Sequence, residues 1–533
     1  MRSRGGRVVI AASITALAGI IRLWNVTLIP GFRMDEVGEN LRAMLIYDGV
    51  NFPLTNNAPF IGALYNYLIA AAFHATGPSM IIARLVVFIF GTLTVTGTFL
   101  LAEEMFDEKV AVISGLLLAL QPGHILVASH VAWSASLAPF FAVFTLYSFY
   151  RAVEGGDERF WIPTGFLAAL GMQAHPSTVV TVLLAPLFYL MITRKLLTTV
   201  KSKQFLLAVI AFCVGYVNMI VFNILHPMGS ITSMFEARWT GVSEPLTIKV
   251  YFRRSIFILL EYLTMLCAGV PIISWKVLVS NVWFYAYICA FFSSLVLALK
   301  GHGKRDALLL LTLLIGFLVL PIGTKGVMTV RVWGFAWGPH YLQQLLPTSM
   351  TLISSLAGRL TKPTFERAGS KEGLNARTKA KPSKRAIILA CGIILLMGLW
   401  PFTNLLRFYG VCERFGITNQ VIIDAEHMLK TLSDEDVAIY IDRYAFQSAL
   451  LARIAMISLN RIDISHGLHG GLSRPSAFMK ENVGRRKLLV FSPPSFEAHK
   501  SFLSSDAFLS HVIRIHTIRN SIGQEVYFIV EAY

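Results

Sequence analysis

Long apolar segments recur along most of this chain of 533 residues. A helix that spans a membrane needs about 20 mostly apolar residues. Segments that reach or approach this length cover 8–24, 81–101, 110–122, 131–150, 160–174, 176–193, 205–224, 282–299, 307–323, 341–358 and 386–402. Two more, 60–76 and 255–273, contain polar or ionised residues and are expected to be interfacial or re-entrant. The pattern predicts a mainly α, polytopic membrane protein.

Composition and charge agree with a membrane protein. Hydrophobic residues make up 55% of the chain and charged residues only 14%, whereas soluble domains are about a quarter charged. The net charge of +17 comes from Lys and Arg clusters between apolar segments. Such clusters are typical of cytoplasmic loops beside anionic lipids, so they argue against nucleic-acid binding. The five cysteines include no CxxC spacing, which indicates neither a disulfide framework nor a zinc site.

Basic segments set the expected orientation. They cover 2–7, 194–203, 300–305 and 359–385, and all four are expected to face the cytoplasm. An even number of crossings then separates each pair, which gives about eleven crossings, or about thirteen if both ambiguous segments span. The first apolar segment lacks a small-residue cleavage site and is expected to remain as a helix. The N-terminus is therefore predicted in the cytoplasm and the C-terminus outside the plasma membrane.

The predicted organisation is a transmembrane domain, 1–402, and an extracytoplasmic α/β domain, 413–533. The first has external loops at 25–58 and 225–254, and its basic loop at 359–385 is rich in Gly, Ser, Lys and Pro, which is typical of disorder. In the second, strands are expected at 436–441 and 487–491, helices at 420–432 and 444–457, and a hairpin from 511–518 and 525–530.

An acidic pair, Asp35 and Glu36, lies in the first external loop. A chain with so few charges has no packing need for carboxylates there, and ionised groups at a membrane boundary indicate metal or proton chemistry on a partly lipid-embedded substrate. The alternative is a solvated loop whose Asp caps a helix that begins near Val37, because Asp favours that position.

Several short motifs then follow in a fixed order. They are Asn57-Ala58-Pro59, Tyr65-Asn66-Tyr67, Arg84-Leu85, Gln121-Pro122 to Ser129-His130, Gly171 to His175-Pro176, and His340-Tyr341 to Pro347. Together with the acidic pair, their order over about residues 8–350 resembles glycosyltransferase family 39. This group includes protein O-mannosyltransferases and the aminoarabinose transferase of lipid A.

The resemblance implies an inverting enzyme of the GT-C fold. Such an enzyme moves a sugar from a polyprenyl phosphate to an acceptor hydroxyl on a protein, lipid or glycan at the outer membrane face, in contact with membrane lipids. Asp35 would act as general base or hold a divalent cation, Mg²⁺ or Mn²⁺, near the donor phosphate; a mechanism without metal is also open. A hydroxyl that attacks an anomeric carbon must lose its proton, which a carboxylate can accept.

The resemblance also assigns site residues. Asp35 and Glu36 are the catalytic candidates, with Asp35 also the candidate metal ligand. The donor-phosphate and lipid candidates are Arg84, His130, His175, Arg238, Arg254, His340 and Tyr341, and the substrate-loop candidates are Asn57 and Tyr65. The family's Lys or His before Pro-Pro is Asn57-Ala58 here, so one expected phosphate or metal partner is missing. A lone His at a helix end, such as His130, is more often structural than functional.

Two other classes of protein remain open. A transporter or lipid flippase usually carries ionisable residues within its spans, in corresponding positions of two repeated halves. Here the segment interiors are nearly free of charge and the charges gather at the external loops, which favours chemistry at the interface. Another polyprenyl-linked glycan ligase would share the external carboxylate. The sequence leaves the sugar, the acceptor, the polyprenol and the oligomeric state open.

Overall fold

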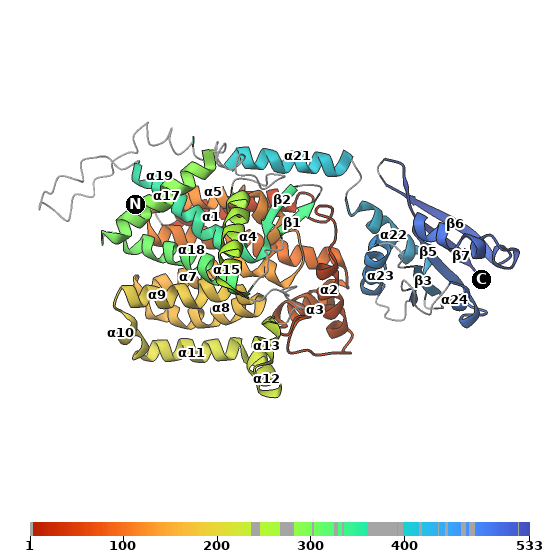
Figure 1. Ribbon diagram of the computed structural model, residues 1–533, viewed down its shortest axis with the longest axis horizontal. Helices are drawn as coiled ribbons and strands as arrows, with labels where there is room; N and C mark the ends of the chain where they lie inside the picture. Colours follow the sequence, from red (N-terminus) through yellow and green to blue (C-terminus); the bar gives the residue numbers. More distant parts are fainter. Residues whose placement is uncertain are drawn as a thin grey trace, which may run out of the picture.

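A helical bundle and a smaller α/β domain make up the structure, a computed structural model (Figure 1). It describes residues 4–235, 246–266, 282–300, 303–323, 329–332, 335–360, 392, 398–414, 418–434, 436–442, 446–459, 465–467, 475–520 and 522–533. The predicted basic loop at 359–385 and most of the apolar segment 386–402 lie outside these residues.

The bundle contains the N-terminal helices of the chain. Their bounds are α1 Arg4–Leu23, α2 Met34–Tyr47, α3 Leu64–Thr76, α4 Met80–Met105, α5 Glu108–Ala119, α6 Pro122–Ala128, α7 Ala138–Val153, α8 Trp161–Ala174, α9 Ala185–Ile192, α10 Leu196–Val200, α11 Lys203–Gly215, α12 Val217–Leu225, α13 Gly229–Phe235, α15 Ile248–Leu266, α17 Val282–Leu299, α18 Lys304–Gly323 and α19 Leu346–Leu360. A short hairpin, β1 Thr329–Val332 and β2 Phe335–Pro339, leads into the 3₁₀ helix η5, His340–Leu345.

Local sequence explains where several helices begin and break. The side chain of Ser79 accepts the Ile81 amide before α4, and Asp107 accepts two amides at the start of α5, so both are N-caps. The predicted span 110–122 corresponds to α5 and ends at Pro122, where α6 begins at an angle of 61° to α5; Pro122 removes a backbone donor and starts the new helix. The predicted span 205–224 bends by 65° between α11 and α12.

Four helices in the described residues are long and apolar enough to cross a membrane, or up to six if each bent pair is one span. The four are Gly5–Leu23, Met80–Met105, Ser134–Val153 and Arg305–Ile322. The predicted total of eleven to thirteen crossings, and the orientation of the termini, stay predictions. At 13 residues, α3 is shorter than the length that a span requires, and the interfacial placement of 60–76 stays a prediction.

The helix α21, Trp400–Arg414, lies along one side of the bundle and leads towards the α/β domain (Figure 1). One face of α21 is buried against α6 and the loop after α1 through Leu405, Phe408, Tyr409 and Cys412. The predicted apolar segment 386–402 therefore meets an amphipathic helix at its C-terminal end.

The α/β domain is built on a five-stranded mixed sheet with the order β4-β3-β5-β7-β6. The strands are β3 Ala438–Asp442, β4 Ser465–Gly467, β5 Lys487–Phe491, β6 Val512–Arg519 and β7 Glu525–Ala532, with β3 parallel to β4 and β5, and β7 antiparallel to β5 and β6. Every residue of β3 and β5 is buried, as expected for apolar runs in parallel strands. Its helices are α22 Gln420–Leu432, α23 Phe446–Ser458, α24 Pro475–Glu481, α25 Pro493–Ala498, α26 Lys500–Leu503 and α27 Asp506–Leu509.

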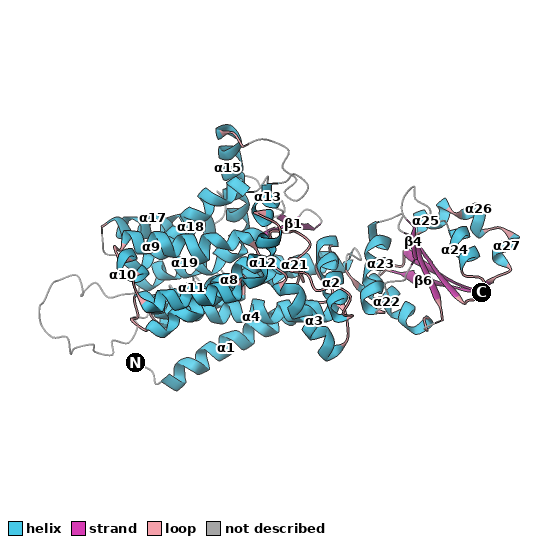
Figure 2. Cartoon of the chain, turned by 90° about the horizontal axis from the view of Figure 1, so that it is seen from below, coloured by secondary structure: helices cyan, strands magenta, loops and turns pink. Residues whose placement is uncertain are grey.

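The α/β domain packs directly on the bundle. In both views, α22 and α23 lie between α2 and the sheet (Figures 1 and 2), and α23 contacts α2. One apolar core includes Val37 and Met44 of α2 together with Ile422 of α22 and Ile454 of α23. The helix that carries the acidic pair is therefore enclosed by both parts of the molecule.

Candidate functional site

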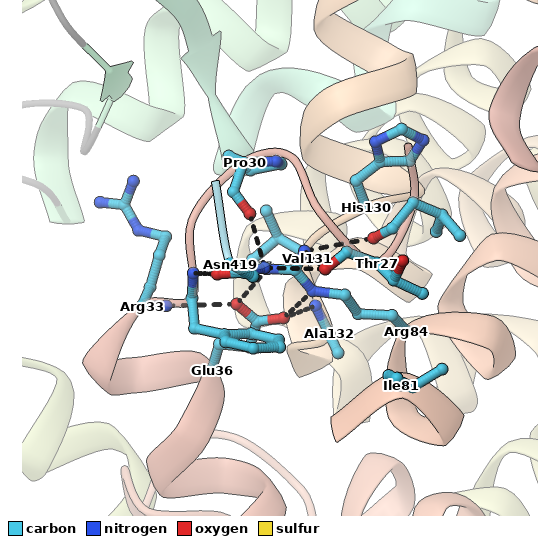
Figure 3. Close-up of polar contacts among 12 residues, drawn as sticks. Thr27, Pro30, Arg33, Glu36, Ile81, Arg84, His130, Val131, Ala132 and Asn419 are labelled. Carbon is cyan, nitrogen blue, oxygen red and sulfur yellow. Dashed lines mark hydrogen bonds and ion pairs between the residues drawn. The ribbon is translucent and has the colours of Figure 1, made fainter. Parts of the chain in front are cut away.

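Glu36 and Arg84 form a fully buried ion pair between α2 and α4 (Figure 3). Arg84 Nε and Nη2 donate to the two carboxylate oxygens at 2.7 and 3.0 Å, which is the bidentate geometry of a strong pair. The backbone amides of Ala132 and Arg33 donate to the same carboxylate at 3.0 and 3.3 Å. Arg84 Nη1 donates to the carbonyl of Val26 at 3.2 Å.

The pair gives two candidate residues a structural role. Glu36 was expected at the reaction centre and Arg84 at the donor phosphate, and in the structure each has no exposed side-chain surface and pairs with the other. The two residues therefore join α2 to α4 and to the loops that precede α2 and η1 (Ser134–Leu137). Their expected parts in the reaction stay predictions. The sequence does not reveal that a carboxylate at the start of α2 meets an arginine of a later helix.

His130, like Glu36 and Arg84, holds separate segments of the protein together. Its side chain is buried, and its Nδ1 and Nε2 lie 2.8 and 2.7 Å from the carbonyl oxygens of Ile29 and Arg22. Arg22 lies in the last turn of α1 and Ile29 in the loop that follows it, so the His130 ring contacts backbone oxygens of both. The predicted phosphate contact is not supported by this placement, because neither ring nitrogen faces an open space.

Tyr65 is a third framework residue. Its ring is fully buried, and its hydroxyl oxygen lies 2.9 Å from Asn40 Oδ1 and also within hydrogen-bond distance of the carbonyl of Ala132, so its one proton is shared between these two acceptors. It therefore joins α3 to α2 and to the Glu36 cluster, rather than lining a substrate loop as expected.

Asp35 lies in the first turn of α2 and is exposed. The next turn of the same face carries Glu39, because residues four apart are neighbours on a helix. The backbone amide of Ser134 donates to Glu39 Oε2 at 2.7 Å, and the Ser134 hydroxyl lies 3.2 Å from Oε1. Burial of its carboxyl group raises the pKa of Glu39 to about 7, and the charge of Asp35 raises it further while the hydrogen bonds from Ser134 and Asn56 oppose the shift.

Glu39 is a candidate functional residue that the sequence interpretation missed. The available signal was its i, i+4 spacing from Asp35 on a helix that was already expected near Val37. Glu36 adjoins Asp35 in sequence but lies on another face of α2. The candidate pair of carboxylates is therefore Asp35 and Glu39.

Tyr341 and His175 approach these carboxylates from the bundle. Burial raises the pKa of Tyr341, in η5, and the charges of Asp35 and Glu39 raise it as well. The rings of His175 and Tyr341 stack with centroids 4.4 Å apart, and the Ser177 amide donates to His175 Nδ1 at 3.2 Å. His175 and Tyr341, both predicted from the sequence, therefore lie together although they are 166 positions apart in the chain.

Asn57 lies beside the same helix. Its Nδ2 is 3.4 Å from the point that a Cβ on Gly38 would occupy. At the start of α2, the Arg33 guanidinium lies 5.7 Å from the ring centre of Trp133, a cation–π arrangement.

The remaining candidates are placed less directly. Arg254 is buried on α15. His340 begins η5, where the structure describes its backbone. Arg238 lies outside the described residues. Within those residues, no group of three or more His, Cys, Asp or Glu side chains converges to hold a metal ion.

Comparison with known proteins shows which folds this structure is similar to. Residues 59–220 match the family model of dolichyl-phosphate-mannose-protein mannosyltransferases. ArnT from Cupriavidus metallidurans, solved with undecaprenyl phosphate, superposes with a TM-score of 0.61 at 12% identity, covering 99% of this chain and 98% of that one. An oligosaccharyltransferase from Archaeoglobus fulgidus superposes with a TM-score of 0.52 at 12% identity, covering 98% of this chain and 74% of that one.

No curated protein matches this chain by sequence. The structural similarities extend over both the bundle and the α/β domain, since they cover nearly the whole chain. The chain therefore has the fold that ArnT and the oligosaccharyltransferase share, and residues 59–220 match the family model of the mannosyltransferases.

Proposed function

We propose that this protein transfers a sugar from a polyprenyl phosphate to an acceptor hydroxyl at the outer face of the membrane, with inversion at the anomeric carbon. The donor class is suggested by ArnT, which was solved with undecaprenyl phosphate. The observation that carries the proposal is the contrast on α2: Asp35 is exposed, whereas the adjacent Glu36 is locked to Arg84.

In this proposal Asp35 is the general base. Its carboxylate accepts the proton of the acceptor hydroxyl as the oxygen attacks the anomeric carbon, and the bond from that carbon to the phosphate oxygen breaks. The phosphate departs with the negative charge, so cationic and hydrogen-bonding groups must stabilise it. In this proposal the stacked rings of Tyr341 and His175 contact the sugar or the phosphate, since the charge of Asp35 acts on Tyr341.

Glu39 supports Asp35 in this scheme. Because its pKa is raised to about 7, Glu39 is partly protonated at neutral pH, which limits the repulsion between two carboxylates on one face of α2.

A divalent cation also fits this face of α2. Two carboxylates one turn apart supply oxygen ligands of the kind that Mg²⁺ and Mn²⁺ prefer. The rest of the coordination would come from the donor phosphate and water, and the bound cation would neutralise charge on the leaving phosphate.

The proposal is tested with Asp35→Asn in the purified full-length protein, supplied with an undecaprenyl-phosphate sugar and an acceptor fraction from membranes. We expect sugar transfer to fall by about 100-fold or more, because the amide cannot accept the proton. Asp424→Asn, at an exposed position on α22, is the matched control and should keep wild-type transfer.

Unchanged transfer by Asp35→Asn would exclude the assigned base. The same assay with EDTA separates the two mechanisms: activity that disappears and returns with Mg²⁺ or Mn²⁺ supports the cation, and activity that persists supports Asp35 as a base without metal.

A further inference from the structure

Arg453 is the one charged residue in the sequence of α23, Phe-Gln-Ser-Ala-Leu-Leu-Ala-Arg-Ile-Ala-Met-Ile-Ser. This helix packs against α2 and is otherwise largely buried. Arg453 is half-buried, and within the described residues its guanidinium forms no hydrogen bond or ion pair. A partly desolvated cation without an anionic partner is costly, so its position calls for an explanation.

The Arg453 guanidinium reaches the face of α2 that carries the carboxylates. Its Nη1 is 3.6 Å from the point that a Cβ on Gly38 would occupy, and Asn57 Nδ2 is 3.4 Å from the same point. Gly38 lies three residues after Asp35, so it is next to Asp35 on the helix surface. Two nitrogen donors, one from the α/β domain and one from the first external loop, therefore converge beside Asp35.

The chemistry of these donors defines what they can bind. An Arg guanidinium and an Asn amide nitrogen both donate hydrogen bonds, and a guanidinium favours the paired oxygens of phosphate and carboxylate groups. Both nitrogens lie close to the same point beside Gly38. Two oxygens of one phosphate or carboxylate group placed there can each accept a hydrogen bond of about 2.9 Å, one from each nitrogen. The missing side chain at Gly38 leaves room for the group against the backbone.

Charge balance favours an anion at this place. Asp35 is exposed and adds a negative charge nearby, which alone would repel a phosphate. Arg453 offsets that charge, so the anion and the ionised base can be present together.

We propose that Arg453 and Asn57 form, over Gly38, a binding site for an anionic group of the substrate, either a phosphate or a carboxylate. The site is completed only when the α/β domain is docked on α2. The identification of this anion as part of a substrate rests on the proposed function. The anion belongs either to the lipid-linked donor or to the acceptor, and the chemistry of recognition is the same for both.

The test uses the thermal unfolding of the full-length protein in detergent, titrated with inorganic phosphate against chloride at equal ionic strength. A ligand that binds only the folded protein raises the unfolding temperature. We expect a phosphate-dependent rise in the wild type, and an apparent affinity about tenfold weaker or worse in Arg453→Gln, because a charge-assisted hydrogen bond is lost. Arg453→Lys keeps the charge and should retain part of the rise.

Two further variants separate binding from folding. Gly38→Ala places a methyl group where the anion would lie and should weaken the phosphate effect while Arg453 is retained. Arg519→Gln removes an exposed arginine that pairs with Glu525 on the same domain, and it should respond to phosphate as the wild type does. Repeating the titration with undecaprenyl phosphate bound identifies the source: a response that disappears assigns the site to the donor, and a response that persists assigns it to the acceptor.

The proposal is overturned if the wild type shows no phosphate-dependent rise, or if Arg453→Gln responds as strongly as the wild type. Neither result depends on sugar transfer. Failure here is therefore distinguishable from failure of the proposed function, which is measured by the transfer assay with Asp35→Asn.

Discussion

Asp35 and Glu36 are adjacent in sequence and have opposite environments. Asp35 is exposed, whereas Glu36 is buried and receives hydrogen bonds from Arg84 and two backbone amides. The helical conformation separates them, since successive residues on a helix point about 100° apart. The carboxylate that accompanies Asp35 in space is Glu39, one turn later.

The raised pKa of Glu39 predicts a pH-dependent stability. Its carboxyl group titrates near pH 7 in the folded protein and near its ordinary value of 4.5 when unfolded. Between these values the folded state binds more protons, so this contribution to stability is complete below about pH 4.5 and is lost as the pH rises to about 7. We expect Glu39→Gln to unfold about 2 °C higher than the wild type at pH 8, with the difference shrinking towards pH 5.

Thermal unfolding at a series of pH values measures this difference. Glu497→Gln, at an exposed carboxylate of the α/β domain, retains Glu39 and should follow the wild-type pH trend. A difference between Glu39→Gln and wild type that is the same at pH 5 and pH 8 would contradict the assignment.

At this scale the sequence predicts some residues of the site and not others. Asn57 lies beside Gly38 of α2, His175 stacks on Tyr341, and the charges of Asp35 and Glu39 act on Tyr341, while the roles predicted for these residues stay predictions. Glu36, Arg84, His130 and Tyr65 belong to the framework, because their partners come from distant segments that no local pattern reveals. Arg453 comes from the other domain and could not be connected to α2 without the packing of α23.

Helix α2 owes its position to a small number of polar contacts. Glu36 and Arg84 join it to α4, and Asn40 donates to the carbonyl of Ala132 at 2.9 Å. Because the ion pair is fully buried, removal of one partner leaves an uncompensated charge in a medium of low polarity. These contacts fix the helix that presents Asp35 and Glu39.

We therefore expect Glu36→Gln and Arg84→Gln each to destabilise the protein by about 3–5 kcal/mol. The double variant should lose less than the two single losses combined, because it leaves no unpaired charge. Thermal unfolding in detergent measures the effect. Glu104→Gln breaks a partly exposed pair with Arg151, which joins α4 to α7, and is expected to cost less than about 1 kcal/mol.

Wild-type stability in Arg84→Gln, combined with weaker binding of undecaprenyl phosphate, would instead return Arg84 to the donor phosphate. This outcome distinguishes a structural arginine from a ligand-binding one.

The elements themselves were predicted with uneven success. The expected helices at 420–432 and 444–457 correspond to α22 and α23, and the expected hairpin corresponds to β6 and β7. Their apolar periods and turn residues are local signals. The three-residue strand β4 was missed because so short a run has no recognisable pattern, and the bend at α11–α12 divides the segment 205–224, which was expected to be a single span.

For the whole molecule, the positive segments predict that α2 and the α/β domain face outward. We expect Asp48→Cys and Glu497→Cys to react with a membrane-impermeant maleimide on intact cells, in a background without native cysteines, and Lys201→Cys to react only after permeabilisation. Asp48, Glu497 and Lys201 are all exposed, so each can be labelled if the reagent reaches it. Labelling of Lys201→Cys alone on intact cells would mean that the orientation is reversed.

The two parts of the molecule are also joined by Asn419, which begins the α/β domain at α22. Its Oδ1 accepts the Phe32 amide at 2.7 Å, its Nδ2 donates to the carbonyl of Thr27 at 2.9 Å, and its own amide donates to the carbonyl of Leu28 at 3.0 Å (Figure 3). These bonds hold the segment 27–32, which leads into α2, against the start of α22.

A chimera that exchanged the α/β domain alone would separate Asn419 from the segment 27–32 to which it is hydrogen-bonded. A graft that keeps these bonds must therefore carry this segment together with the domain.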